Sequence, residues 1–177
     1  MTLVAKPQEG EYSPYTISYI SLLPDDGLVL TQMQTNLQAV IDEVKNLPAA
    51  WLTTPFADGE WTVQEILVHI MDTERIFAHR ALWIARGDAT ELPGFDQDKY
   101  VPFANANSRP LESILAEYET IRAATLSLFN SFDDAALTRI GVSNKNPLSV
   151  RAALYIIAGH ELYHLKSIRD NYVGRSA

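Results

Sequence analysis

The chain has 177 residues, of which 47% are hydrophobic, and this length suits one globular domain that buries about 70% of the surface of its unfolded chain. Its 14 basic and 22 acidic residues give a net charge of -8 without a local basic cluster, which argues against nucleic acid and anionic membranes as partners. The absence of cysteine means that metal ligands must be His, Asp or Glu, and that any reactive thiol must come from a substrate.

We expect residues 1–177 to form a single domain that acts on a small molecule. No stretch approaches the roughly 20 apolar residues that a transmembrane helix requires, and the first residues lack a continuous apolar run. From these features we expect a cytoplasmic protein without a membrane partner.

Residues 1–26 are rich in Pro, Tyr and Ser and are expected to form an irregular N-terminal arm with one short turn. Three aromatic residues of this arm, Tyr12, Tyr15 and Tyr19, could roof a pocket or simply anchor the arm. Anchoring is the more common role of such residues.

The first predicted helix follows a turn that ends at Gly27 and continues to about Leu47, where a proline stops it. Asp25 or Asp26 is the expected N-cap. Apolar residues recur at every third or fourth position, which indicates one buried face.

The second predicted helix has the clearest start signal in the chain. Thr62 and Glu65 have the spacing of a capping box, and the helix should run to about Arg86, with Gly87 as its stop. The carboxylate of Glu74 falls in the middle of the apolar face. A buried carboxylate there requires a polar or charged partner, either a metal site or an arginine.

A crossover of about 20 residues, 87–107, has turn residues throughout and no periodicity, and a loop of this kind often serves as a lid or a pocket wall. The third predicted helix starts after Ser108, its expected N-cap, and ends near Phe132. After a link that we expect to be irregular, the fourth helix spans residues 150–171. Four amphipathic helices without a convincing strand predict an all-α four-helix bundle with long crossover loops.

Two histidines of the last helix, His160 and His164, lie one turn apart on its apolar stripe, opposite three basic residues. Unpaired imidazoles are costly to bury, so something inside should bind them. His69, on the flank of the second helix, could reach inward and complete a three-histidine site for a divalent ion with open coordination positions. The alternative is a pair of core histidines that hydrogen-bond to backbone or tyrosine, and the spacing alone favours neither.

The letters HELYH, residues 160–164, also match the H-E-x-x-H pattern of zinc proteases, in which the glutamate is the general base. The context argues against a protease. No His or Glu follows His164, and Ser167 and Ile168 keep the helix continuous, so Asp170 should stay on the helix and not fold back.

In combination, Trp61-Thr62-Val63, His69 and the pair His160 and His164 resemble the DinB-like superfamily, and the similarity covers essentially the whole chain. The resemblance implies a down-up-up-down four-helix bundle, often a homodimer, with nickel, zinc or a similar ion bound by His69, His160 and His164. Some members are transferases or maleylpyruvate isomerases that use a low-molecular-weight thiol. Others are described as metal-dependent hydrolases, and many have no known activity.

Three functions follow as hypotheses. The first is a thiol-dependent transferase acting on small electrophiles, because coordination to a cation deprotonates a thiol. The second is a hydrolase of small esters or amides, in which Glu161 or Glu74 moves protons. Glu161 lies close enough to the inner face to support the metal ligands, although a salt bridge is the simpler interpretation. The third is a non-catalytic stress protein that binds a metal or small ligand.

Overall fold

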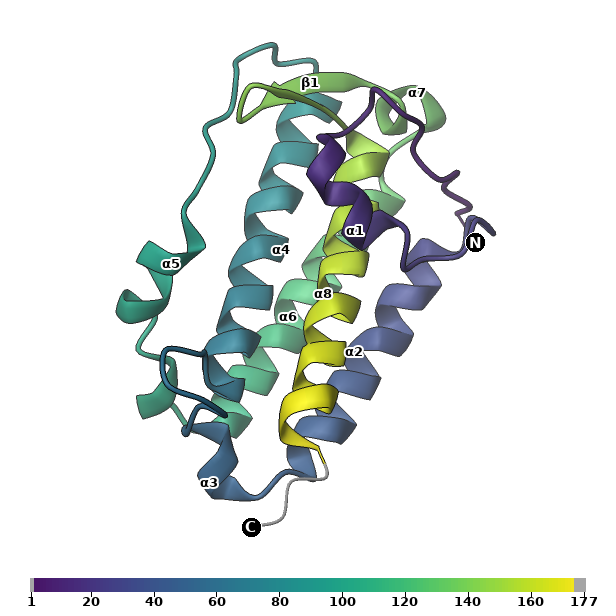
Figure 1. The fold of residues 1–177 in the computed structure, drawn as a ribbon. Helices are drawn as coiled ribbons and strands as arrows, with labels where there is room; N and C mark the ends of the chain where they lie inside the picture. Colours follow the sequence, from purple (N-terminus) through teal and green to yellow (C-terminus); the bar gives the residue numbers. More distant parts are fainter. Residues whose placement is uncertain (1, 174–177) are drawn as a thin grey trace.

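In the computed structural model, which describes residues 2–173, four long helices pack side by side. They are α2 (Val29–Lys45), α4 (Val63–Ala85), α6 (Leu111–Asn130) and α8 (Val150–Tyr172). Figure 1 shows that α2 and α8 run in one direction and α4 and α6 in the other. The predicted all-α four-helix bundle with down-up-up-down order is therefore confirmed.

The predicted start and stop of α4 are also confirmed. Thr62 Oγ1 accepts a hydrogen bond from the Glu65 backbone N–H at 3.2 Å, and a Glu65 carboxylate oxygen accepts one from the Thr62 N–H at 2.8 Å. These two bonds satisfy backbone donors that a helix start would otherwise leave unpaired. Gly87 follows the helix with φ of +79°, a conformation that favours glycine.

The predicted N-caps of the first and third helices are wrong. Asp26 accepts a hydrogen bond from the Leu28 N–H at 2.8 Å, so it closes a turn, and α2 begins only at Val29 without a side-chain cap. Ser108 belongs to the short 3-10 helix η3 (Ala106–Ser108), where its hydroxyl donates to a backbone oxygen. Pro110 occupies the N-cap position of α6 without a side-chain hydrogen bond.

The link before α8 is ordered, which corrects the expectation of an irregular segment without strands. After the short helix α7 (Asp134–Leu137), the strands β1 (Ile140–Ser143) and β2 (Asn146–Ser149) form an antiparallel hairpin. Its two turn residues, Asn144 and Lys145, have φ of 50° and 63°. Two residues with positive φ make the turn that matches strand twist, but the usual signal for it is Asn-Gly, which this sequence lacks.

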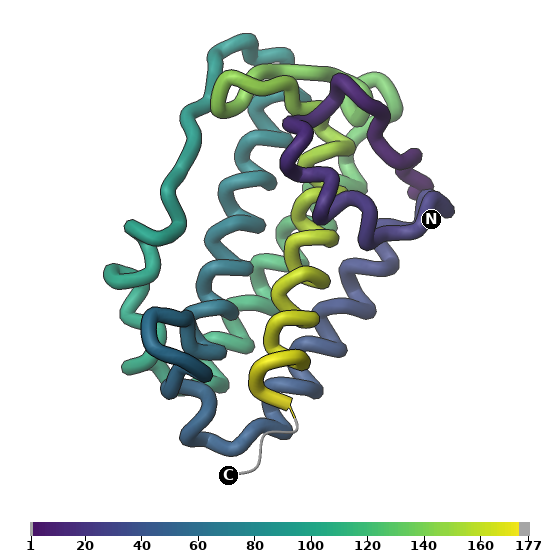
Figure 2. Tube along the Cα trace, viewed as in Figure 1, coloured from purple at the N-terminus to yellow at the C-terminus, as the bar shows by residue number. Residues whose placement is uncertain are grey.

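The crossover between α4 and α6 is held by the hairpin. The backbone of Leu92 donates to Val142 O at 3.0 Å and accepts from Asn144 N at 2.8 Å. Below this attachment the crossover contains α5 (Gln97–Tyr100), η2 (Val101–Phe103) and η3. Figure 2 shows its trace descending outside α4 from the hairpin end of the bundle to the other end. This return is what allows α4 and α6 to point the same way.

The N-terminal arm contains η1 (Pro14–Thr16) and α1 (Ile17–Ile20), and α1 packs against α8. A Cβ built on Gly159 would overlap the backbone oxygen of Tyr19, so only glycine permits this approach. The last short helix, α3 (Ala49–Leu52), follows α2.

The buried apolar residues form two clusters along the bundle. One includes α8 residues 150 and 152–158, and the other includes Leu165, Ile168 and Tyr172 of the same helix. Between them α8 carries His160 and Glu161, both buried. None of the helices in the described part of the chain combines the length and hydropathy needed to cross a membrane.

Candidate metal centre

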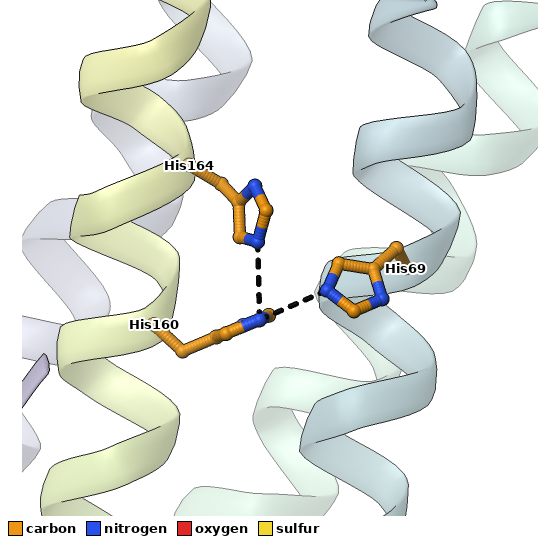
Figure 3. A group of neighbouring side chains, drawn as sticks. All are labelled: His69, His160 and His164. Carbon is orange, nitrogen blue, oxygen red and sulfur yellow. Dashed lines mark hydrogen bonds between the residues drawn. The ribbon is translucent and has the colours of Figure 1, made fainter. Parts of the chain in front are cut away.

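Three histidines from two helices meet inside the bundle (Figure 3). His69 of α4 and His160 of α8, 91 residues apart, have their Nε2 atoms 2.9 Å from each other, and His164 Nε2 lies 3.1 Å from His160 Nε2. One ligand atom from each ring lies within 4.8 Å of the others. The fourth histidine, His79, is exposed and packs against Trp83, as its position on the outer side of the second helix predicts.

These three imidazoles are neutral at physiological pH. Burial lowers the pKa of His69 to about 4, and burial together with the charge of His69 lowers the pKa of His164 to about 3. Burial, with the charges of both neighbours, holds the pKa of His160 well below its usual value. Neutral imidazole is the form that binds a metal ion.

The arrangement fits a cation better than a set of hydrogen bonds. A neutral ring nitrogen offers either one N–H or one lone pair, so His160 Nε2 cannot pair well with two other ring nitrogens at once. Nitrogens bonded at about 2.0–2.1 Å to one zinc ion, at angles of about 90–109°, lie roughly 2.8–3.4 Å apart. The two observed separations, 2.9 and 3.1 Å, fall in this range.

The alternative of core histidines bonded to backbone or tyrosine finds no support in the hydrogen bonds. Within residues 2–173, the ring nitrogens of His69, His160 and His164 hydrogen-bond only to one another. Aromatic rings pack around them instead. The Trp61 ring lies 4.8 Å from that of His69, and the Tyr19 ring lies 5.2 Å from that of His160.

A cavity of about 310 Å³ opens beside the histidines. Ligand pockets begin at about 300 Å³, so a small molecule fits. Its walls come from α4, α8, the N-terminal arm, the crossover and the hairpin. The crossover contributes Gly94, Phe95 and Gln97, in agreement with the pocket wall expected there. Tyr15 and Tyr19 of the arm also line the cavity, whereas Tyr12 packs against the core.

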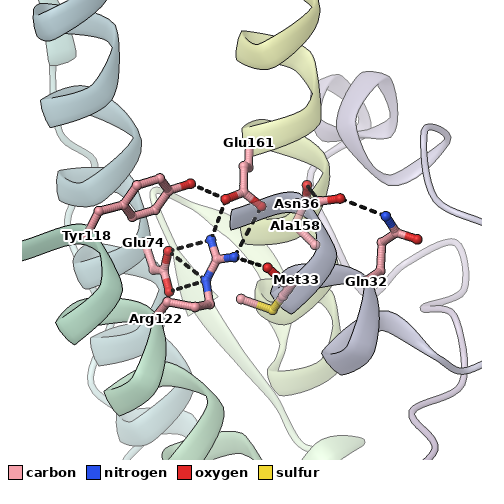
Figure 4. A network of polar contacts seen from close by, with 8 residues as sticks. All are labelled: Gln32, Met33, Asn36, Glu74, Tyr118, Arg122, Ala158 and Glu161. Carbon is pink, nitrogen blue, oxygen red and sulfur yellow. Dashed lines mark hydrogen bonds and ion pairs between the residues drawn. The ribbon is translucent and has the colours of Figure 1, made fainter. Parts of the chain in front are cut away.

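Glu74 and Glu161 meet a buried arginine of α6 (Figure 4). Arg122 donates to Glu74 through Nε at 3.0 Å and Nη2 at 2.9 Å, and to Glu161 through Nη2 at 2.8 Å. It also donates to the backbone oxygen of Met33, and Tyr118 donates its hydroxyl to Glu161. The polar partner expected for Glu74 is therefore an arginine, Arg122.

This network ties four helices together in a place that water does not reach. Arg122 and Glu74 have side chains only 1% exposed, and Glu161 is 0% exposed. Burial raises the pKa of Glu161 despite Arg122, and burial together with the Glu161 charge raises the pKa of Tyr118 well above its usual value. Tyr118 therefore keeps its proton and acts as the donor.

The H-E-x-x-H letters do not build a protease site here. In that motif the glutamate must face the metal side to act on a bound water. Glu161 instead points to Arg122 and Tyr118, and α8 continues to Tyr172. Asp170 stays on the helix, as expected, and pairs with Lys166.

Two polar residues of the cavity, Thr73 and Arg80, were not among the predicted site residues. They follow His69 by four and eleven positions, which are one and three helical turns, so all three share one face of α4. That spacing was the available signal. Threonine and arginine are also common on the solvated faces of helices, so the sequence alone does not distinguish a cavity residue from a surface residue here.

A family model matches this chain over most of its length. The model describes the DinB superfamily and covers residues 30–168. The chain belongs to the DinB superfamily. Among similar proteins is one of Geobacillus thermodenitrificans, 29% identical over 67% of this chain and 69% of its own, that carries the name "Putative metal-dependent hydrolase". A protein of Oceanobacillus iheyensis with the same description is 25% identical over 79% of this chain and 81% of its own.

Solved structures share the fold. YfiT from Bacillus subtilis, described as a probable metal-dependent hydrolase with an unusual four-helix bundle topology, has a TM-score of 0.70 and 19% identity, with 94% of this chain and 91% of that chain covered. A mycothiol-dependent maleylpyruvate isomerase has a TM-score of 0.66 and 11% identity, with 83% of this chain and 61% of that chain covered. At these identities the likeness concerns the fold.

Proposed function

We propose that this DinB protein is a metal-dependent enzyme in which His69, His160 and His164 bind a divalent ion, zinc or nickel, and that it transfers a low-molecular-weight thiol to a small electrophile. The observation that carries the proposal is the convergence of three neutral Nε2 atoms at a cavity lined by no carboxylate of residues 2–173. The fold shared with a mycothiol-dependent isomerase supports the thiol as cosubstrate.

A divalent ion held by His69, His160 and His164 would supply positive charge that lowers the pKa of a bound thiol or water. Figure 3 shows a ring nitrogen of His69 and one of His164 turned toward that of His160, and all three histidines line the cavity. Three imidazole ligands would leave coordination positions of such an ion open to a substrate. In the transfer, the thiol sulfur forms a bond to the electrophilic carbon, and the leaving group departs with the bonding electrons and the thiol proton. The aromatic rings of Trp61, Tyr19 and Tyr163 pack against the imidazoles of His69, His160 and His164, respectively.

The second candidate is a hydrolase of a small ester or amide, which the names of the relatives favour. Hydrolysis of this kind benefits from a base that removes a proton from water. Glu161 and Glu74 are the carboxylates considered for that task, and both accept hydrogen bonds from Arg122 away from the cavity lining. We therefore propose a supporting role for both, in which they fix α4, α6 and α8 and so orient the histidines.

The test begins with metal content. Protein purified without a histidine tag should contain or take up about one zinc or nickel ion per chain, and the His160→Ala, His164→Ala double variant should not. His79→Ala is the matched control, because His79 is exposed and lies away from the cluster. A wild-type protein that ignores both ions would overturn the proposal.

The metal-loaded protein is then incubated with a panel of thiols and a model electrophile, and separately with ester and amide substrates. We expect acceleration of the thiol transfer, and none in the double variant. Acceleration of ester or amide cleavage alone would favour the hydrolase. Metal binding without either activity would favour the non-catalytic binding protein. The homodimer and the cytoplasmic location stay predictions, and sedimentation velocity tests the first.

A further inference from the structure

One arginine of the cavity is buried without a carboxylate partner. Arg80 of α4 is 6% exposed, and no Asp or Glu of residues 2–173 forms an ion pair with it. One of its five N–H donors bonds to Pro93 O at 2.8 Å, and its guanidinium lies 4.7 Å from the centre of the Phe77 ring. A buried charge with no counterion is costly. The Arg80 guanidinium therefore lies in a place where an added anion would be stabilised.

A second polar group of the same cavity also lacks a partner. Thr73 is 3% exposed, and its Oγ1 has no hydrogen-bond partner in the described part of the chain. A helical threonine commonly bonds to the carbonyl four residues before it, which here is that of His69, but Thr73 does not. Thr73 and Arg80 therefore present unused donors to one space, at increasing distance from His69 along α4.

The charges around this space favour an anion. The described residues that line the cavity include no Asp, Glu or Lys, although the chain carries 22 acidic residues and a net charge of -8. Arg80 is the one Arg or Lys among the described residues that line the cavity. A single guanidinium matches one negative charge, and its planar donors fit a carboxylate in particular. A phosphate dianion would leave charge unmatched.

We propose that the cavity binds a small organic carboxylate, with the carboxylate on Arg80, a hydrogen bond from Thr73 Oγ1, and the reactive end of the molecule at the histidine cluster. Phe77, Leu148 and Ile156 line the space and suit an apolar carbon chain between the two ends. The role of the reactive end rests on the function proposed above. The pairing of the carboxylate with Arg80 does not require the metal.

The proposal is tested by calorimetric titration of three matched probes, hexanoate, hexanol and hexyl phosphate, into metal-free protein. Hexanoate should bind at least tenfold more tightly than hexanol. Arg80→Met should remove that preference, Arg80→Lys should keep part of it, and Thr73→Val should weaken hexanoate several-fold. Arg86→Met is the control, because Arg86 is an exposed residue that follows the same helix and lies outside the cavity lining.

The proposal is overturned if hexanoate and hexanol bind equally, or if Arg80→Met and Arg80→Lys, both folded by circular dichroism, bind hexanoate like the wild type. Tighter binding of hexyl phosphate than of hexanoate would contradict the choice of a carboxylate. Titration of zinc-loaded protein with 6-mercaptohexanoate then tests both ends of the proposed ligand, the carboxylate at Arg80 and the thiol at the histidine cluster. A protein that binds hexanoate but no zinc refutes the proposed function alone, and one that binds zinc but not hexanoate refutes this inference alone.

Discussion

Removal of the Arg122 guanidinium should destabilise the protein strongly. In Arg122→Met the side chain keeps most of its length, but the carboxylates of Glu74 and Glu161 lose their shared counterion in a site with side-chain exposures of 1% and 0%. Removing one partner of a buried ion pair typically costs about 3–5 kcal/mol. Domains of this kind have a total stability of about 5–15 kcal/mol, so the loss is a large fraction of the whole.

The assay is urea denaturation followed by circular dichroism, with wild type and variant in the same buffer. Arg75→Met is the matched control, because the Arg75 side chain is 47% exposed and its ion pairs with Asp72 and Glu117 lie at the surface. Such pairs contribute about 0–1 kcal/mol. If Arg122→Met loses no more than this control, then Glu74 and Glu161 do not depend on Arg122, and the supporting role assigned to them fails.

Three further outcomes follow from individual contacts. Gly159→Ala should lower the unfolding temperature and expose the N-terminal arm to limited proteolysis, because its Cβ overlaps Tyr19 O; unchanged proteolysis would refute the close approach. Thr62→Ala should cost about 1 kcal/mol in urea denaturation through loss of the capping box, and Thr62→Ser should restore most of it. The metal-free protein should lose stability as the pH falls from 6.5 toward about 4, because the unfolded chain binds protons in this window and the buried histidines do not. The urea midpoint of the His160→Ala, His164→Ala variant should fall less steeply over the same range, and equal slopes would contradict the lowered pKa values.

Local physical signals made much of this fold predictable. The period of apolar residues indicates four helices, and the capping box marks the start of α4 to the residue. The inward stripe that carries His160 and His164, together with the flank position of His69, anticipated the cluster of three rings. Each of these features depends on residues within a few turns of one another, which is why the sequence contains enough information.

Features that depend on distant partners were less visible. The sequence predicts that Glu74 has a polar or charged partner, but nothing near it identifies that partner as Arg122, which lies 48 residues away on another helix. The hairpin was missed because its turn uses Asn144 and Lys145 where a glycine is usual. The polar side chain of Thr73 was overlooked because a lack of hydrogen-bond partners appears only in the folded structure.

Two buried arginines show how partners separate a structural role from a binding role. Arg122 and Arg80 have similar burial, at 1% and 6% exposure, but Arg122 has two carboxylates and Arg80 has none among the described residues. Arg80→Met removes one hydrogen bond, worth about 1 kcal/mol, and also removes the cost of an uncompensated charge, so its urea midpoint should stay near the wild-type value or rise. A loss of about 3 kcal/mol or more, as for Arg122→Met, would mean that Arg80 serves the fold and would remove the reason to expect a ligand there.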